Sequence, residues 1–153
     1  MDAILKRGLL AWNQFHMRMA QLVSTLSKDP DRKVGAVLVT PDRRQMSVGY
    51  NGFPSSLPDN PELLEDKAYK LAHTVHAEDN CLRQAPFSAA GCTLYITRFP
   101  CLDCASKIVN AGVKQVVAPR PDFEHPRWGR SWQLAGAKLR HYGVTLTYLE
   151  LEK

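Results

Sequence analysis

The 153-residue sequence is poor in cysteine and has no long hydrophobic run. Its four cysteines are too few for a disulfide-stapled scaffold. No stretch approaches the roughly 18 consecutive apolar residues of a membrane span, and the N-terminus turns polar and amphipathic too soon for a signal peptide. The sequence therefore predicts a protein of the reducing cytoplasm with no membrane partner.

Repeats, low-complexity tracts and a linker between two halves are also lacking. Hydrophobic residues make up 44% of the chain and charged residues 23%, which is ordinary for a globular protein. We therefore expect residues 1–153 to form one domain. The net charge of +5 suits an anionic ligand, either a nucleic acid or a phosphorylated small molecule.

Helical and strand patterns alternate along the chain, which favours an α/β architecture. Helices are expected over about residues 8–27, 75–84, 101–111 and 132–142. Strands are expected over about residues 34–40, 45–50, 92–97, 113–118 and 144–149. The proline-rich segments 55–66 and 119–130 are expected to be loops.

The chemistry is concentrated in two short motifs, His-Ala-Glu at 76–78 and Pro-Cys-Leu-Asp-Cys at 100–104. One imidazole and two thiolates are a ligand set suited to zinc, and three protein ligands leave the fourth position open, as in catalytic zinc sites. We predict that His76, Cys101 and Cys104 bind one Zn²⁺ per chain.

Both motifs fall where helices are expected to begin. His76 and Glu78 would point to nearly opposite sides in mid-helix, but in a first turn both can reach a metal beyond the helix end. Glu78 would then lie beside the metal without binding it, where a general acid/base must be. Cys101 and Cys104 also start a helix, whose free N–H groups favour thiolates.

A structural four-ligand zinc would need another donor. His73 lies one helical turn before His76 and could point the same way. Cys81 and Cys92 are the other candidates, but both are expected to be packed thiols.

The pair of motifs is the signature of zinc nucleobase deaminases. Over about residues 10–118 the chain resembles the deoxycytidylate (dCMP) deaminase family. The segments that carry the resemblance are Ser27–Pro30 (SKDP), Val34–Ala36, Gly49–Pro54 (GYNGFP), His76–Glu78 and Phe99–Cys104. The resemblance implies a cytidine-deaminase-like three-layer fold, with helices on both faces of a mixed five-stranded sheet and its last two strands parallel.

The resemblance implies hydrolytic deamination of dCMP to dUMP and ammonia, which supplies dUMP for thymidylate synthesis. Alternatives are another cytosine nucleotide (dCTP or a 5-substituted dCMP), a base in RNA or single-stranded DNA, and a zinc-stabilised binding module without activity. No Lys/Arg run with interleaved aromatics is present, so no stable nucleic-acid partner is expected. The family also implies a homo-oligomer, a hexamer or a dimer.

Substrate contacts follow from the same resemblance. Asn51 would bind the deoxyribose, unless Asn51-Gly52 is only a turn, and Ala77 would lie against the substrate. Ser27 and Lys28 are candidates for the 5′-phosphate, the alternative being a capped helix end with a solvated lysine. Arg98 is a further phosphate candidate.

Two regions depart from the family pattern. Residues 28–72 contain neither Cys nor His, so the second zinc of regulated members is not expected. Segment 119–130 and the start of the next helix hold Trp128 and Trp132, which either cover the substrate or pack the last helix on the sheet. Packing is favoured for Trp132.

Overall fold

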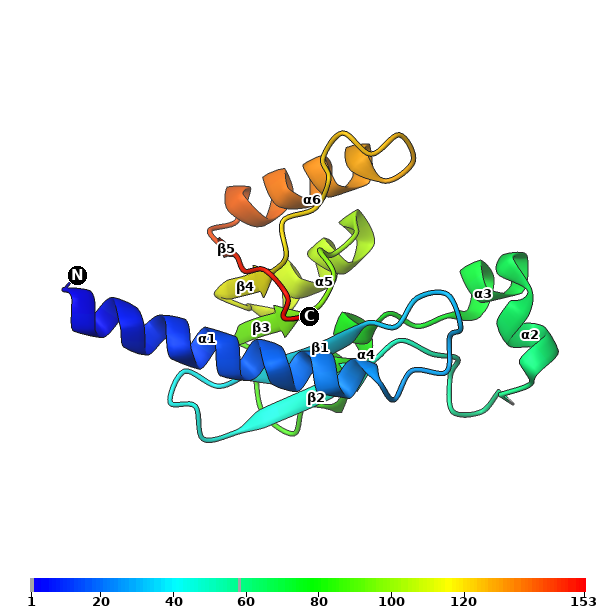
Figure 1. Ribbon diagram of the computed structural model, residues 1–153, viewed down its shortest axis with the longest axis horizontal. Coiled ribbons are helices and arrows are strands. Elements are labelled where there is room, and N and C mark those ends of the chain that lie inside the picture. Colours follow the sequence, from blue (N-terminus) through cyan, green and yellow to red (C-terminus); the bar gives the residue numbers. More distant parts are fainter. Residues whose placement is uncertain (1, 58) are drawn as a thin grey trace.

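Five strands form one mixed sheet in the computed structural model, which describes residues 2–57 and 59–153 (Figure 1). The strands are ordered β2-β1-β3-β4-β5. They are β1 (Gly35–Val39), β2 (Met46–Tyr50), β3 (Thr93–Ile96), β4 (Gln115–Ala118) and β5 (Thr145–Tyr148). Strand β1 pairs antiparallel with β2 and β3, whereas β3–β4 and β4–β5 are parallel, so the predicted mixed sheet and its parallel last pair are confirmed.

The described residues contain six helices. They are α1 (Ala3–Ser24), α2 (Pro61–Glu65), α3 (Lys67–His73), α4 (Ala77–Gln84), α5 (Leu102–Ala111) and α6 (Gly129–His141). Helix α1 begins where the Leu5 backbone N–H donates to the Asp2 carboxylate at 2.9 Å. Helix α5 ends at Gly112, whose φ of 81° lies in the left-handed region that glycine tolerates best.

The helices divide unequally between the two faces of the sheet (Figure 1). Helix α1 covers one face, where Met17 and Ala20 pack on Val37 and Val117. Helices α4, α5 and α6 cover the other face, over a larger core that includes Leu38 and Leu94. Strand β1 is buried on both sides as a result, which explains its unbroken apolar run. The predicted three layers are confirmed.

Two glycines of the β1–β2 hairpin let helices approach from opposite sides. A Cβ at Gly35 would lie 2.0 Å from the Ala20 carbonyl oxygen of α1, and one at Gly49 would lie 2.4 Å from the Cys81 backbone nitrogen of α4. Neither contact is possible with a larger residue unless a helix moves. The hairpin is therefore held directly between the backbones of α1 and α4.

The loop expected over residues 55–66 is wrong in part, because α2 occupies Pro61–Glu65 and α3 follows at once; Pro58 lies outside the described residues. Asn60 and Asp66 cap these short helices with their side-chain oxygens. Helix α1 also begins earlier than expected, since its first two turns project beyond the sheet and need no apolar periodicity. None of the described helices combines the length and hydropathy that crossing a membrane requires.

Candidate active site

The three predicted zinc ligands come together between the starts of two helices. His76 directly precedes α4, Cys101 directly precedes α5, and Cys104 lies in the first turn of α5. His76 Nδ1 lies 3.3 Å from Cys104 Sγ and 3.6 Å from Cys101 Sγ. A tetrahedron built on ordinary Zn–N and Zn–S bonds has edges of about 3.5–3.8 Å. The donor atoms therefore have both the chemistry and the spacing that zinc needs.

The electrostatics of this cluster favour a cation. Contact with the Cys104 sulfur lowers the pKa of Cys101, and the same contact raises the pKa of Cys104. The bond to Cys101 also raises the pKa of His76. One thiolate thus forms easily at the helix start, and a metal that binds there displaces the remaining protons.

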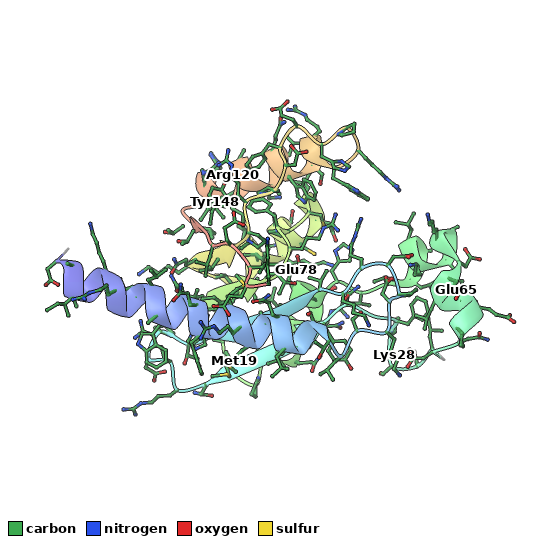
Figure 2. All side chains as sticks on the ribbon, viewed as in Figure 1. Met19, Lys28, Glu65, Glu78, Arg120 and Tyr148 are labelled. Atoms are coloured by element: carbon green, nitrogen blue, oxygen red, sulfur yellow. The ribbon has the colours of Figure 1, made fainter. Side chains whose placement is uncertain are left out.

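Glu78 lies in the first turn of α4 and is only 4% exposed. Burial raises the pKa of its carboxyl to about 7. A carboxyl with that pKa can take up and release a proton near neutral pH, as an acid/base group must. It lines the same cavity as His76 and Cys101, near the middle of the molecule (Figure 2).

The other donor candidates lie elsewhere. Among the described residues, the only group of three or more potential metal donors is His76, Cys101 and Cys104. Cys81 and Cys92 are fully buried in the core, as expected for packed thiols, and burial raises the pKa of Cys81 to about 12. His73 instead packs on the Tyr69 ring in α3, with ring centroids 4.2 Å apart.

A cavity of about 630 Å³ opens in front of these residues, which is ample for a nucleotide. Asn51, Ala77 and Arg98 all line it, so three of the five proposed substrate contacts are brought together. The Asn51 side chain is already engaged with the backbone: its Nδ2 donates to the Arg32 carbonyl and its Oδ1 accepts from the Val34 N–H, both at 2.8 Å. It therefore holds segment 27–34 against the cavity.

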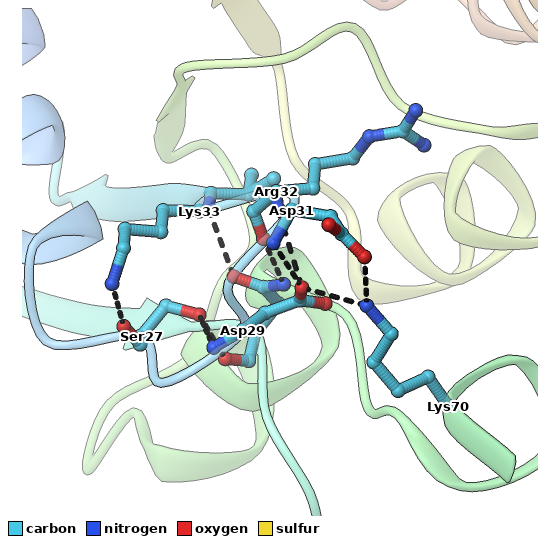
Figure 3. A network of polar contacts seen from close by, with 8 residues as sticks. Ser27, Asp29, Asp31, Arg32, Lys33 and Lys70 are labelled. Carbon is cyan, nitrogen blue, oxygen red and sulfur yellow. Dashed lines mark hydrogen bonds and ion pairs between the residues drawn. The ribbon is translucent and has the colours of Figure 1, made fainter. Parts of the chain in front are cut away.

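Segment 27–34 is tied together by a network of polar contacts (Figure 3). Ser27 Oγ donates to the Asn51 carbonyl at 2.9 Å. Asp29 Oδ1 accepts from the Asp31 and Arg32 backbone N–H groups. Lys70 of α3 is 8% exposed and pairs with Asp29 at 3.0 Å and Asp31 at 2.6 Å. The segment is thus fixed both to β2 and to α3.

The structure brings neither Ser27 nor Lys28 into the cavity, contrary to the expectation that they bind phosphate. Ser27 is buried and serves the network just described. Lys28 is exposed, pairs with Asp59 and lies well apart from Glu78 in Figure 2. Neither residue caps α1, whose C-terminal cap is Thr25.

Several residues of the cavity wall were not predicted from the sequence, notably Arg32, Lys70, Arg127 and Ser131. Ser131 Oγ accepts the Leu102 N–H at 3.3 Å and so holds α6 to the start of α5. Trp128 and Trp132 both line the cavity, and Trp132 is also buried in the core, so packing and covering are not exclusive. Segment 119–130 could not be matched to any family motif, and no other signal marked it.

Comparison with known proteins agrees with this geometry. Residues 10–119 match the family described as the cytidine and deoxycytidylate deaminase zinc-binding region. The chain belongs to this family. His76, Cys101 and Cys104 are the residues that can hold its zinc, and the chain is a hydrolytic deaminase by class.

Individual relatives lie at moderate identity. An uncharacterized deaminase encoded in the luxG 3′ region of Aliivibrio fischeri is 36% identical over 92% of this chain and 95% of that protein. Human deoxycytidylate deaminase is 34% identical over 71% of this chain but only 64% of its own length. The dCMP deaminase of cyanophage S-TIM5, solved with dCMP and dUMP, superposes with a TM-score of 0.67 at 25% identity, covering 97% of this chain and 99% of that one.

Proposed function

We propose that this protein deaminates dCMP to dUMP and ammonia, supplying dUMP for thymidylate synthesis. The observation that carries the proposal is the buried Glu78 carboxyl beside the His76-Cys101-Cys104 donor set, at the end of a nucleotide-sized cavity. Its similarity to deoxycytidylate deaminases and to a phage dCMP deaminase supports the choice of substrate.

Zinc, when bound there, would supply a water of lowered pKa for attack at C4 of cytosine. Glu78 would take one proton of that water and deliver it to N3 of the ring, and would then move the second proton, from the hydroxyl now on C4, to the departing amine. Burial, which raises its pKa to about 7, equips one carboxyl for both directions of transfer. Phe99 and Trp132, which are both buried, line the same cavity.

Arg98 is our candidate for the 5′-phosphate, and Asn51 and Ala77 for the sugar and base. Arg98 is half-buried, lines the cavity and lies in the segment before the metal-binding cysteines. A phosphate gains charge-assisted hydrogen bonds from a guanidinium, which a nucleoside leaves unpaired. We therefore expect the order dCMP, CMP, deoxycytidine, cytosine.

We further propose a homo-oligomer in the cytoplasm. Four free cysteines, two of which must stay reduced to bind metal, suit a reducing compartment. Trp12, Phe15 and Leu22 form an exposed stripe on α1, and Arg43 of the hairpin lies 4.9 Å from the Trp12 ring, so this stripe faces β2.

The adjoining face of β2 is also apolar. Met46, Val48 and Tyr50 are each 38–40% exposed on the side away from α4, since the alternating Ser47 and Gly49 face Cys81 of α4. The α1 stripe and this face of β2 together make an apolar surface, which we call the α1–β2 surface. It consists of Trp12, Phe15, Leu22, Met46, Val48 and Tyr50. A second copy of the chain is the occupant we propose, because monomers rarely expose such a continuous patch.

A turnover assay tests the activity directly. Zinc-loaded protein, containing one zinc per chain by metal analysis, is incubated with dCMP, CMP, deoxycytidine and cytosine while ammonia and uracil products are measured. We expect dUMP from dCMP at the highest kcat/KM. Deoxycytidine as good as dCMP, or two zincs per chain, would contradict the proposal.

A further inference from the structure

A second, smaller cavity adjoins the one that holds Glu78. Its volume is about 250 Å³, and it shares Arg32, Arg98, Phe99, Trp128 and Trp132 with the larger cavity. Arg120 lines only the smaller cavity and Arg127 only the larger one. A ligand in the larger cavity could therefore extend past Arg98 into the smaller one.

Four arginines surround this passage without a carboxylate partner. Among the described residues, the guanidinium groups of Arg32, Arg98, Arg120 and Arg127 make no ion pair and no hydrogen bond, unlike those of Arg18, Arg83 and Arg140. Their contacts are with aromatic rings instead. Arg32, Arg98 and Arg127 lie 5.7, 5.9 and 4.7 Å from the Trp128 ring centroid.

Arg120 extends the cluster away from Trp128. It lies 5.2 Å from both the Phe123 and the Tyr148 ring centroids, and Figure 2 shows Arg120 and Tyr148 close together. The rings orient the guanidinium groups by cation–π contact but leave their N–H groups free for an anion. Arg98 is half-buried near Arg32, and both burial and that neighbouring charge lower its pKa.

This charge exceeds what one phosphate needs. A phosphate monoester carries at most two negative charges, whereas four guanidinium groups line the two adjoining cavities. Lys70, which also lines the larger cavity, is instead paired with two aspartates. Three of these arginines are gathered around the single indole ring of Trp128. A compact polyphosphate chain fits such a cluster better than the widely spaced phosphates of a nucleic-acid strand do.

We propose, resting on the deaminase function above, that the active site accepts cytosine nucleotides with a polyphosphate chain, whose terminal phosphates occupy the smaller cavity beside Arg120. The first phosphate lies at Arg98, and deoxycytidine di- and triphosphate are then substrates as well as dCMP. The reaction is unchanged: water adds at C4, ammonia leaves, and no phosphate bond is broken.

The test compares kcat/KM for deoxycytidine, dCMP, dCDP and dCTP on the zinc-loaded enzyme. We expect dCTP to be used about tenfold better than dCMP, as a further charge-assisted contact would give. The Arg120→Ala and Arg120→Gln variants should lower the dCTP/dCMP ratio about tenfold, and Gln keeps much of the stem that packs on Phe123. Arg44→Ala, exposed in the β1–β2 turn, is the matched control and should leave every rate unchanged.

Three outcomes would overturn the inference. In the first, dCMP is used but dCTP is no better than deoxycytidine, which leaves the proposed function intact. In the second, both Arg120 variants fold, by their thermal denaturation, yet the dCTP/dCMP ratio is unchanged. In the third, a cytosine-containing single-stranded oligonucleotide is used better than dCTP, which would assign the arginines to nucleic acid. No turnover of any nucleotide would remove the proposed function as well.

Discussion

Glu78 and the three metal donors have different roles, which substitutions can separate. Cys104 and Glu78 are both buried, but the first is needed to hold the metal and the second to move protons. A substitution that keeps the shape of Glu78 and removes its ionisation therefore isolates the chemistry from the fold.

We expect Glu78→Gln to keep zinc and fold while losing most turnover. General acid/base steps contribute about 10²- to 10⁴-fold, and here one carboxyl would serve several transfers. Metal content, circular dichroism and kcat for dCMP are measured together. A variant that retained a tenth of the wild-type rate would exclude Glu78 as the proton shuttle. The paired variant Cys104→Ala should instead lose zinc and stability.

Arg98 and Lys28 form a matched pair for the phosphate. Arg98 lines the cavity, whereas Lys28 is exposed and pairs with Asp59. Loss of a hydrogen bond to a charged group costs about 1.5–3 kcal/mol, so Arg98→Ala should lower kcat/KM for dCMP about 10- to 100-fold and affect deoxycytidine much less. Lys28→Ala should leave the ratio of the two substrates as it is. Equal declines on both substrates in Arg98→Ala would show that Arg98 is structural.

A few polar contacts hold together the segments around the cavity. The pair Asp29 and Lys70 lies at the centre of these contacts. Asp29→Ala removes the acceptor of two backbone N–H groups as well as an ion pair, whereas Asp29→Asn removes only the charge. We expect the free energy of unfolding to fall by about 1–3 kcal/mol in the alanine variant and less in the asparagine variant. Urea denaturation measures both.

The control for this series is Asp59→Asn, since its partner Lys28 is exposed and such pairs contribute about 0–1 kcal/mol. KM for dCMP should rise with the loss of stability in the Asp29 variants, because Arg32 leaves its place in the cavity wall. An unchanged KM in Asp29→Ala would show that segment 27–34 does not position substrate contacts.

A buried histidine in α1 makes the stability of the protein depend on pH. His16 is 1% exposed, packs on Tyr95, and its Nδ1 has no hydrogen-bond partner. Burial lowers its pKa, so the unfolded chain binds a proton more readily than the native protein does. This contribution to stability is present above about pH 6.5 and is lost as the pH falls through the lowered native pKa.

His16→Leu, of similar volume, should therefore unfold with a smaller pH dependence below pH 6.5 than the wild type. Urea denaturation at several pH values between roughly 7.5 and 5 measures the slope. His141→Gln, at the exposed end of α6, is the control. Identical slopes for the His16 variant and the wild type would exclude His16 as the source.

The periodic elements and the metal site were predictable from sequence because their rules are local. The metal site was predictable because four residues lie at helix starts with fixed spacing: His76, Glu78, Cys101 and Cys104. Strand β1 was predictable because burial on both faces gives it an unbroken apolar run. Helices α2 and α3 were not predicted because their ends are marked by capping residues and they carry no apolar stripe. Arg32 and Arg127 were not predicted as site residues because they are 95 positions apart in the sequence and come to the same cavity only when the chain folds.

At the scale of the whole molecule, one side of the sheet is left less covered than the other. The α1–β2 surface includes one face of β2, which is an edge strand because no further strand pairs with its outer side among the described residues. Association of two copies would bury this surface and protect the open strand edge.

We therefore expect a mass above 17.2 kDa in sedimentation at micromolar concentration. Phe15→Glu and Val48→Lys should each lower the mass toward that of the monomer, because a charge would be buried in the contact. Tyr142→Glu, exposed beyond α6, should not change it. A monomeric wild-type protein would refute the proposed oligomer.

The β1–β2 hairpin held between α1 and α4 bears on how this chain tolerates mutation. Gly35 and Gly49 touch neither the cavity nor the metal donors, yet a single methyl group at either would collide with a helix backbone. In a library selected for activity, both positions would be as intolerant as Glu78, and the survivors alone would suggest a role in chemistry. Selection for soluble folded protein would separate the two cases, since glycine substitutions would still be lost whereas Glu78→Gln would be retained.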